Sequence, residues 1–189
     1  MTNLPKRELT DIGSLKALAH PLRQQMLARL KRHGPATSAD LAAEFGADRG
    51  ATSYHLRQLA RYGFIEEDAD RSAGRRRYWR APAQDVRLPR RPTDAQTTKA
   101  MRVVLAGWRQ QAVEAIQGFL ADPEAYGEFA AASLQSFAAV RLTVDELGQF
   151  GEEYLELLTR WQRSDAESPP ESRPITVLFS ALPTPDEPT

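Results

Sequence analysis

The chain has 189 residues with 25 basic and 25 acidic side chains, and its formal net charge is therefore zero. This total hides a division, because residues 1–92 hold 18 basic and 10 acidic side chains (+8) and residues 93–189 hold 7 and 15 (−8); such asymmetry is a sign of nucleic-acid contact by the basic part. The absence of cysteine excludes disulfides and thiolate sites. With no apolar run near the roughly 18 residues of a membrane span and no signal-peptide core, we expect a cytoplasmic protein.

Four short helices are predicted in the basic half. The first covers residues 12–19, with Asp11 as its cap, and the second starts at Pro21, which fits a first helical turn. The third follows Thr37 or Ser38 and ends at Gly46, and the fourth runs from its cap Asp48 to Gly63. Two short extended runs, residues 64–67 and 77–80, flank a polar turn and read as a hairpin.

Two short helices joined by Gly46-Ala47-Asp48 and followed by a basic hairpin indicate a winged helix-turn-helix. In this motif the second helix lies in the DNA major groove. If Thr52, Leu56 and Leu59 face inward, the outward and first-turn positions offer hydroxyls and guanidinium groups that suit base edges and phosphates. The candidates on this helix are Arg49, Gly50, Ser53, Tyr54, His55, Arg57 and Arg61. For His55, which lies near the edge of the inward face, packing and a phosphate contact remain equal alternatives.

The hairpin is rich in arginine. Arginines in a loop beside a recognition helix suit contacts with the DNA backbone or the minor groove, although a solvated loop is the alternative. Arg71, Arg75, Arg76, Arg77 and Arg80 lie within ten residues, and Arg75, Arg76 and Arg77 are the main candidates.

Several strings in residues 12–81 carry a family resemblance. LKALAHPLRQQMLARL, SADLAAEFG, RGATSYHLRQLARYGFIEED and GRRRYWRA resemble the arsenic-repressor (ArsR) family of bacterial transcription factors, in a branch with an appended C-terminal region. The resemblance implies DNA contacts by Ser53, Tyr54 and Arg57. Metal-sensing members place cysteines near the third helix or histidines in a C-terminal helix. This chain has no cysteine and no histidine beyond residue 55, so we expect no metal site and no other cofactor.

The acidic half contains two amphipathic helices. One covers residues 95–120, and the other covers residues 145–161 after a capping box formed by Thr143 and Glu146. Residues 133–142 and 174–182 read as strands that would give a small α/β unit, although the Ala-rich stretch 128–140 also suits a helix. The first helix is our candidate for dimerisation, through Met101, Leu105, Trp108, Ala112, Ile116 and Phe119.

Together these patterns predict a mainly α (α+β) protein. We expect a flexible tail at 1–11, a winged helix-turn-helix domain at 12–81, a linker at 82–93, a helical or small α/β dimerisation and effector domain at 94–182, and a tail at 183–189. The expected function is sequence-specific regulation of transcription by a homodimer that binds operator DNA. We expect a repressor rather than an activator, controlled by an unknown small-molecule effector. The alternative is an architectural or protein-interaction module that binds DNA without sequence preference. We expect no enzyme, because residues 94–189 offer no nucleophile–base pair, phosphate loop or histidine.

Overall fold

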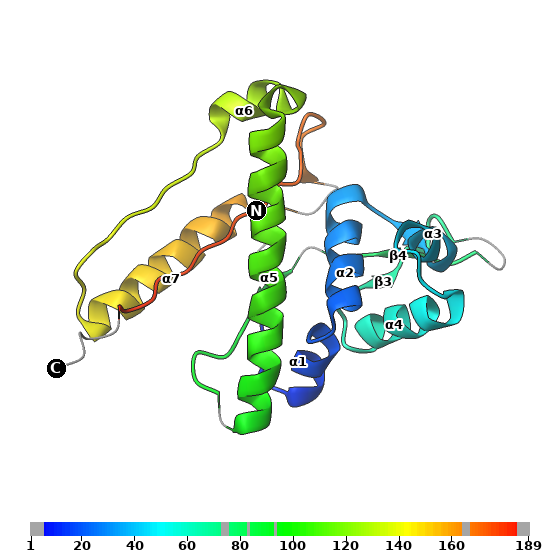
Figure 1. The fold of residues 1–189 in the computed structure, drawn as a ribbon, viewed down its shortest axis with the longest axis horizontal. Coiled ribbons are helices and arrows are strands. Elements are labelled where there is room, and N and C mark those ends of the chain that lie inside the picture. Colours follow the sequence, from blue (N-terminus) through cyan, green and yellow to red (C-terminus); the bar gives the residue numbers. More distant parts are fainter. Residues whose placement is uncertain (1–5, 73–75, 83, 93, 164–166, 185–189) are drawn as a thin grey trace. The chain divides into compact units, whose positions relative to one another are not determined.

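The computed structural model describes residues 6–72, 76–82, 84–92, 94–163 and 167–184 (Figure 1). It is mainly helical with two small sheets, as the sequence predicts. The chain divides into two compact units: one contains the described residues up to Trp108 and 167–174 with Arg163, and the other contains residues 109–162 and 175–184. Each unit is described below by itself.

Four helices form the body of the first unit. Helix α1 is Ile12–Leu18, α2 is Pro21–His33, α3 is Ser38–Glu44 and α4 is Arg49–Arg61. The predicted caps are present, because the side chains of Asp11, Thr37 and Asp48 accept hydrogen bonds from the first turns of α1, α3 and α4. Local sequence signals therefore define these helices.

A three-stranded antiparallel sheet has the strand order β2-β4-β3. Strands β3 (Glu66–Glu67) and β4 (Tyr78–Arg80) pair as the predicted hairpin. Strand β2 (Ala36–Thr37) pairs with the other edge of β4, with Thr37 opposite Tyr78. This third strand has only two residues, which is too short to give an alternating pattern in the sequence. It attaches the hairpin to the start of α3.

A second, parallel pair joins the two ends of the helix-turn-helix region. Strand β1 (Lys6–Glu8) pairs with β5 (Asp85–Arg87), and Leu9, which follows β1, is fully buried. The sequence predicts a flexible tail and a linker at these residues. The difference arises because the pairing joins segments far apart in sequence, which local composition does not report.

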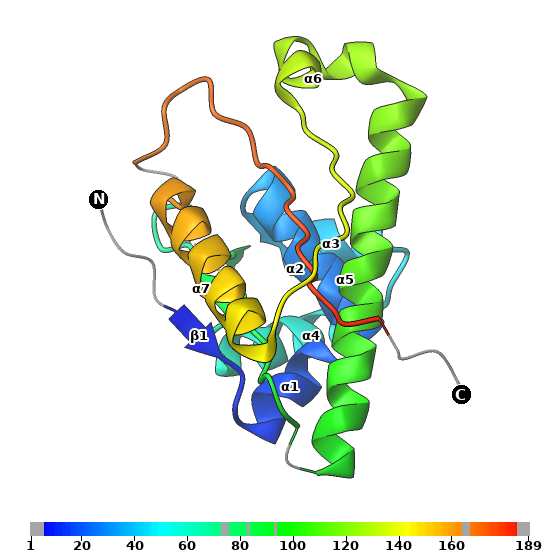
Figure 2. The same ribbon diagram turned by 90° about the vertical axis from the view of Figure 1, so that its left-hand side faces the viewer.

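The core of the first unit also includes the beginning of a long helix. Helix α5 (Ala95–Ala121) is one continuous helix (Figure 2). Its residues Ala100 and Val104 are buried in the same cluster as Leu15, Met26 and Leu56. The Gln24 amide of α2 donates to the carbonyl oxygen of Val103 at 3.4 Å. The first part of α5 is thus a component of the helix-turn-helix core.

The second unit continues α5 into shorter helices. A 3₁₀ turn, η1 (Pro123–Tyr126), leads to α6 (Glu128–Ala132), and α7 spans Val144–Trp161. The predicted capping box of α7 is confirmed, with Thr143 and Glu146 bonded to each other reciprocally. No described helix is long and apolar enough to cross a membrane.

The two strands predicted in the acidic half do not form. Residues 133–142 and 174–182 are without regular secondary structure, so within the described residues the C-terminal helices are joined to no sheet. The second of these segments lies along α7 (Figure 1), where Phe179 stacks on Tyr154 with ring centroids 3.8 Å apart. In residues 174–182, the apolar side chain of Phe179 therefore packs against α7 and not within a sheet. The helical alternative holds only for Glu128–Ala132 within the Ala-rich stretch.

Candidate nucleic-acid interface

Helix α4 is attached to the core by one face. Thr52, Leu56 and Leu59 are fully buried, at the four- and three-residue spacing of one helical face. The rest of the helix surface is available to a partner. It carries exposed Arg49, Gly50, Tyr54, Arg57 and Arg61, together with half-buried Ser53.

The turn before α4 orients its first residues outward. Gly46 has a φ of +59°, a left-handed conformation that favours glycine, and it ends α3. The Asp48 carboxylate then accepts a hydrogen bond from the backbone N–H of Ala51 at 2.9 Å, which starts the next helix. The sequence GADRG thereby presents Arg49 and Gly50 at an exposed helix start.

The arginines of α4 have no acidic partners within the described residues. Arg49, Arg57 and Arg61 form no ion pair there, and Arg57 Nε donates to the carbonyl oxygen of Ser53 at 3.2 Å. The remaining guanidinium N–H groups of Arg57 therefore keep their capacity to bind guanine or phosphate oxygens.

The hairpin is less basic than its sequence suggests. Arg80 pairs with Glu66 at 2.6 Å, Arg77 with Glu67 at 3.4 Å, and Arg71 with Asp68 at 3.8 Å. Register explains the first two pairs, because β3 places both glutamates beside β4. Counting arginines along the sequence could not detect this neutralisation, which depends on strand pairing.

Two hairpin arginines differ from these three. Arg76 is exposed and lies over the Tyr78 ring, 5.8 Å from its centroid, without an ion pair among the described residues. Arg75 lies outside the described residues. Among the described hairpin arginines, Arg76 is thus the one whose charge is not offset by an ion pair.

His55 lies against the body of the domain. Its ring centroid is 4.4 Å from that of His20, and its Nδ1 is 3.4 Å from Arg23 Nη1. Burial, and then the neighbouring His20 and Arg23, lower the pKa of His55 below its ordinary value. This geometry favours the packing alternative for His55.

A cavity of about 410 Å³ opens where α3, α4 and the hairpin meet. Ser53 and Arg57 line it from α4, Arg76 and Arg77 from the hairpin, and Ser38 from the start of α3. Trp79 of β4 lines it as well, and neither Ser38 nor Trp79 is among the site residues that the sequence predicts. Their approach depends on the pairing of β2 with β4, for which the sequence gives no local signal.

The six dimerisation candidates on α5 do not share one free surface. Met101 and Trp108 pack against the core of the first unit, and Ala112 is buried. Phe119 is half-buried with Tyr126 5.2 Å away, whereas Leu105 and Ile116 are 49% and 46% exposed. The exposed stripe consists of Leu105, Val113, Ile116 and Leu120. The predicted apolar face is therefore divided between internal packing and solvent.

Residues 18–68 match a protein-family model described as "Helix-turn-helix domain". This match confirms the predicted helix-turn-helix region, which here includes α2, α3 and α4. No curated protein matches the chain.

Three solved structures show a distant likeness. An apo mutant of ZitR from Lactococcus lactis is 13% identical and covers 76% of this chain and 84% of its own. YusO from Bacillus subtilis is 20% identical (77% and 79% covered), and RV1404 from Mycobacterium tuberculosis is 16% identical (66% and 86% covered). Each has a TM-score of 0.34, which is too low to define a shared overall fold.

Proposed function

We propose that this chain, in which residues 18–68 match a helix-turn-helix domain, is a sequence-specific transcriptional regulator that binds operator DNA as a homodimer. Residues 12–81 form the DNA-binding unit in this proposal, and residues 94–182 carry dimerisation and control. The first action we assign is repression, which the resemblance to the arsenic-repressor family implies.

One observation carries the proposal. Arg49, Arg57 and Arg61 lie exposed on the free side of a helix whose opposite side is fully buried, without ion pairs among the described residues. A helix of this kind fits the major groove, where arginine can bind guanine O6 and N7 in bidentate fashion. Tyr54, Ser53 and Gly50 lie beside these arginines and complete the proposed reading surface, with Arg75, Arg76 and Arg77 assigned to the backbone.

Two considerations support dimerisation: the two half-sites of an operator and the exposed apolar side chains of the C-terminal helices. Helix-turn-helix dimers read two half-sites about one helical turn apart, and a second copy doubles the contact with DNA. Within the described part of residues 109–184, Ala112 is the single buried residue, while large apolar side chains such as Ile116, Leu120 and Trp161 are exposed. We assign the dimer contact to exposed apolar side chains of this kind, because burying them against a second copy would remove apolar surface from water.

The proposal also includes control by a small molecule. It rests on the appended residues 94–182, which include α5 and therefore touch the helix-turn-helix core through Ala100 and Val104. A ligand that shifted α5 would act directly on the domain that holds α4.

A footprint on the DNA upstream of the protein's own gene tests the proposal. We expect protection of one site with two half-sites whose centres are about 10 bp apart. Competition with unrelated duplex at moderate salt should leave the footprint intact. If every duplex competed equally, the regulator assignment would fail and the architectural alternative would replace it.

A further inference from the structure

We propose that the cavity between α3, α4 and the hairpin is a seat for one phosphodiester group of the DNA backbone, and that this seat fixes the register of α4 in the groove. The inference rests on the proposed DNA binding and adds to it a specific site. It also assigns a role to Ser38, a residue outside the recognition helix.

The lining of the cavity has the chemistry of an oxyanion site. Three guanidinium groups, those of Arg57, Arg76 and Arg77, and the hydroxyls of Ser38 and Ser53 all line it, whereas no carboxylate among the described residues does. Arginine forks match the two free oxygens of a phosphodiester, and serine hydroxyls add neutral donors. A volume of about 410 Å³ lies within the range of small-ligand sites and accommodates the phosphate with part of its sugars.

The charges around the cavity remain positive after local pairing is considered. Arg77 interacts with Glu67 at 3.4 Å, but both side chains are more than one-third exposed, so this pair is weak. Asp40 is the carboxylate that interacts with Arg76, and its Oδ2 accepts hydrogen bonds from both the N–H and the hydroxyl of Thr37. These hydrogen bonds, more than Arg76, hold the pKa of Asp40 below its usual range. Arg57 and Arg76 are thus available to an external anion.

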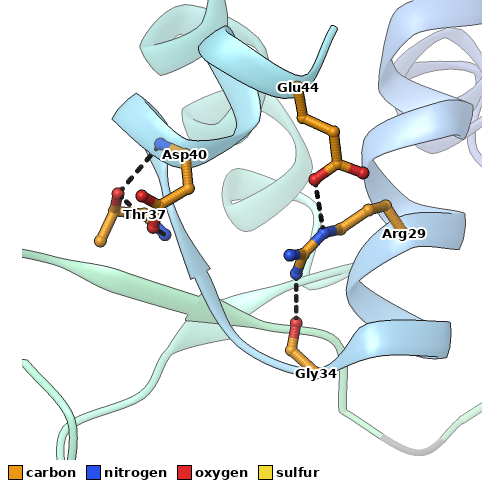
Figure 3. A network of polar contacts seen from close by, with 5 residues as sticks. All are labelled: Arg29, Gly34, Thr37, Asp40 and Glu44. Atoms are coloured by element: carbon orange, nitrogen blue, oxygen red, sulfur yellow. Dashed lines mark hydrogen bonds and ion pairs between the residues drawn. The ribbon is translucent and has the colours of Figure 1, made fainter.

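The residues around this cavity are held in place by contacts within the protein, so the site is preformed. The capping box between Thr37 and Asp40 fixes the start of α3, and Arg29 of α2 binds the last residue of this helix (Figure 3). Arg29 donates to Glu44 at 2.9 Å and to the carbonyl oxygen of Gly34 at 3.0 Å. A preformed site loses less conformational entropy on binding.

The hairpin wall is anchored in the same way. Trp79 lies opposite Ala36 in the β2–β4 pairing and packs against the core, so this wall cannot move independently of the start of α3. Because α4 provides Ser53 and Arg57 to the same cavity, a phosphate bound there fixes the recognition helix and the hairpin at one point of the backbone. Contacts to the backbone set position, while base contacts set sequence preference.

Ser38→Asp is the variant that tests the seat. It places a carboxylate in the cavity, and an acidic residue suits the first turn of a helix, so folding should be preserved. Ser38→Asn is the neutral control of the same shape. Val144→Asp is the charge control, because Val144 is the first residue of α7 and is exposed.

Affinity for a specific and for a random duplex is measured over a range of salt concentrations. Like charges brought together at an interface are costly, so Ser38→Asp should lose about tenfold or more on both duplexes. The slope of log affinity against log salt should also fall by about one unit. Val144→Asp should bind as the wild type does. Ser38→Asn replaces the hydroxyl by another neutral hydrogen-bonding group, so it should lose much less affinity than Ser38→Asp and keep the wild-type salt slope. Thermal melting should show that all four proteins are folded.

Phosphate ethylation interference locates the contact. We expect one phosphate in each half-site whose ethylation blocks wild-type binding but adds no further loss to Ser38→Asp. Equal affinities of wild type and Ser38→Asp would overturn the seat while leaving the specificity of the wild type, and hence the proposed function, in place. A wild type without sequence preference that still loses affinity in Ser38→Asp would support the seat and defeat the proposed function.

Free phosphate is the competing source of the same chemistry. Replacing chloride by inorganic phosphate at constant ionic strength should leave wild-type affinity for DNA unchanged, because the seat is built for a phosphodiester held by the rest of the interface. If inorganic phosphate changed wild-type binding but not that of Ser38→Asp, the cavity would be a free-anion site and the proposal would be wrong.

Discussion

Arg57 and Arg77 have the same side chain but different surroundings. Arg57 is exposed and has no ion pair among the described residues, whereas Arg77 interacts with Glu67 at 3.4 Å. DNA contact by Arg77 competes with an existing partner, and contact by Arg57 does not. At the residue scale, only some of the arginines in the sequence are therefore free of ion pairs and available for DNA contact.

Arg57→Ala should weaken discrimination between the operator and other sequences. The expected loss is about 1–3 kcal/mol if its contact with guanine is bidentate. The ratio of specific to nonspecific affinity measures it. Arg160→Ala, which removes an arginine from α7, is the matched control and should leave this ratio unchanged. Equal losses on both duplexes would show that Arg57 contacts only the backbone.

Arg76→Ala should weaken binding to every sequence by a similar factor. It removes one phosphate contact, so the salt slope should fall by about one unit. Arg77→Ala should have a smaller effect, because the Arg77–Glu67 pair already offsets part of its charge. Titrations at several salt concentrations with one random duplex would distinguish these two variants, and the reverse order would contradict the assignment.

The His20–His55 contact should make stability depend on pH. Burial and the neighbouring Arg23 lower the pKa of both histidines in the folded protein. Below pH about 6.5 the unfolded chain therefore binds protons that the folded chain does not, and stability falls as pH decreases, levelling off below the folded pKa values.

Thermal melting of wild type and His55→Gln between pH 8 and 5 measures this effect. The variant should lose less stability on acidification than the wild type does. His33→Gln, at an exposed position away from the pair, should behave as the wild type. Parallel melting curves for wild type and His55→Gln would refute the role of the pair.

At the element scale, local signals account for what could be predicted. The caps Asp11, Thr37 and Asp48, the proline at the start of α2 and the Thr143–Glu146 box define helices through bonds within a few residues. The hairpin β3–β4 was predicted for the same reason. The recognition helix and its exposed residues followed from these elements alone.

Elements that depend on distant partners could not be predicted. Strands β1, β2 and β5 contain two or three residues and exist through pairing with remote segments. The cavity at Ser38 and Trp79 follows from the pairing of β2 with β4, whereas the ion pairs of Arg77 and Arg80 depend on the register within the β3–β4 hairpin. Conversely, residues 174–182 have a strand-like pattern, but no described segment pairs with them.

Gly107 should be required for the contact between α2 and α5. A Cβ at this position would clash with Oε1 of the buried Gln24. Gly107→Ala gains up to about 1 kcal/mol of helix propensity but loses about 1–3 kcal/mol to overpacking, so a net destabilisation is expected. Thermal or denaturant unfolding measures the difference.

Two further variants identify the cause. Gly148→Ala lies in α7, where a Cβ meets nothing within 4 Å, and it should stabilise the protein slightly. Combining Gln24→Ala with Gly107→Ala should cost less than the sum of the two single changes, because the clash is removed. Additive losses would show that the glycine acts in another way.

At the scale of the whole molecule, the net charge of zero consists of a basic and an acidic half. The basic half contains the helix-turn-helix match, and the acidic half disfavours contact with DNA through its charge. The described residues after Ala112 bury no side chain fully, and the proposed function assigns contact with a second copy to this half. The two halves would then serve binding and assembly.

Ile116→Glu should shift the protein from dimer to monomer. Ile116 belongs to the exposed stripe of α5, and burying a carboxylate in a dimer interface without a partner is costly. Gln117→Glu adds the same charge at an exposed polar position of the same helix and is the control. Sedimentation velocity should show a dimer for the wild type and the control. A wild type that is monomeric at micromolar concentration would contradict the proposed assembly.

Selection of duplexes from a random-sequence pool by the full-length protein tests the central claim most directly. If the chain reads DNA as a homodimer, sequencing of the bound fraction will show one enriched motif with two inverted half-sites about one helical turn apart. Enrichment of a single half-site would leave sequence reading but remove the dimer. A bound fraction with the same composition as the starting pool would contradict sequence-specific regulation.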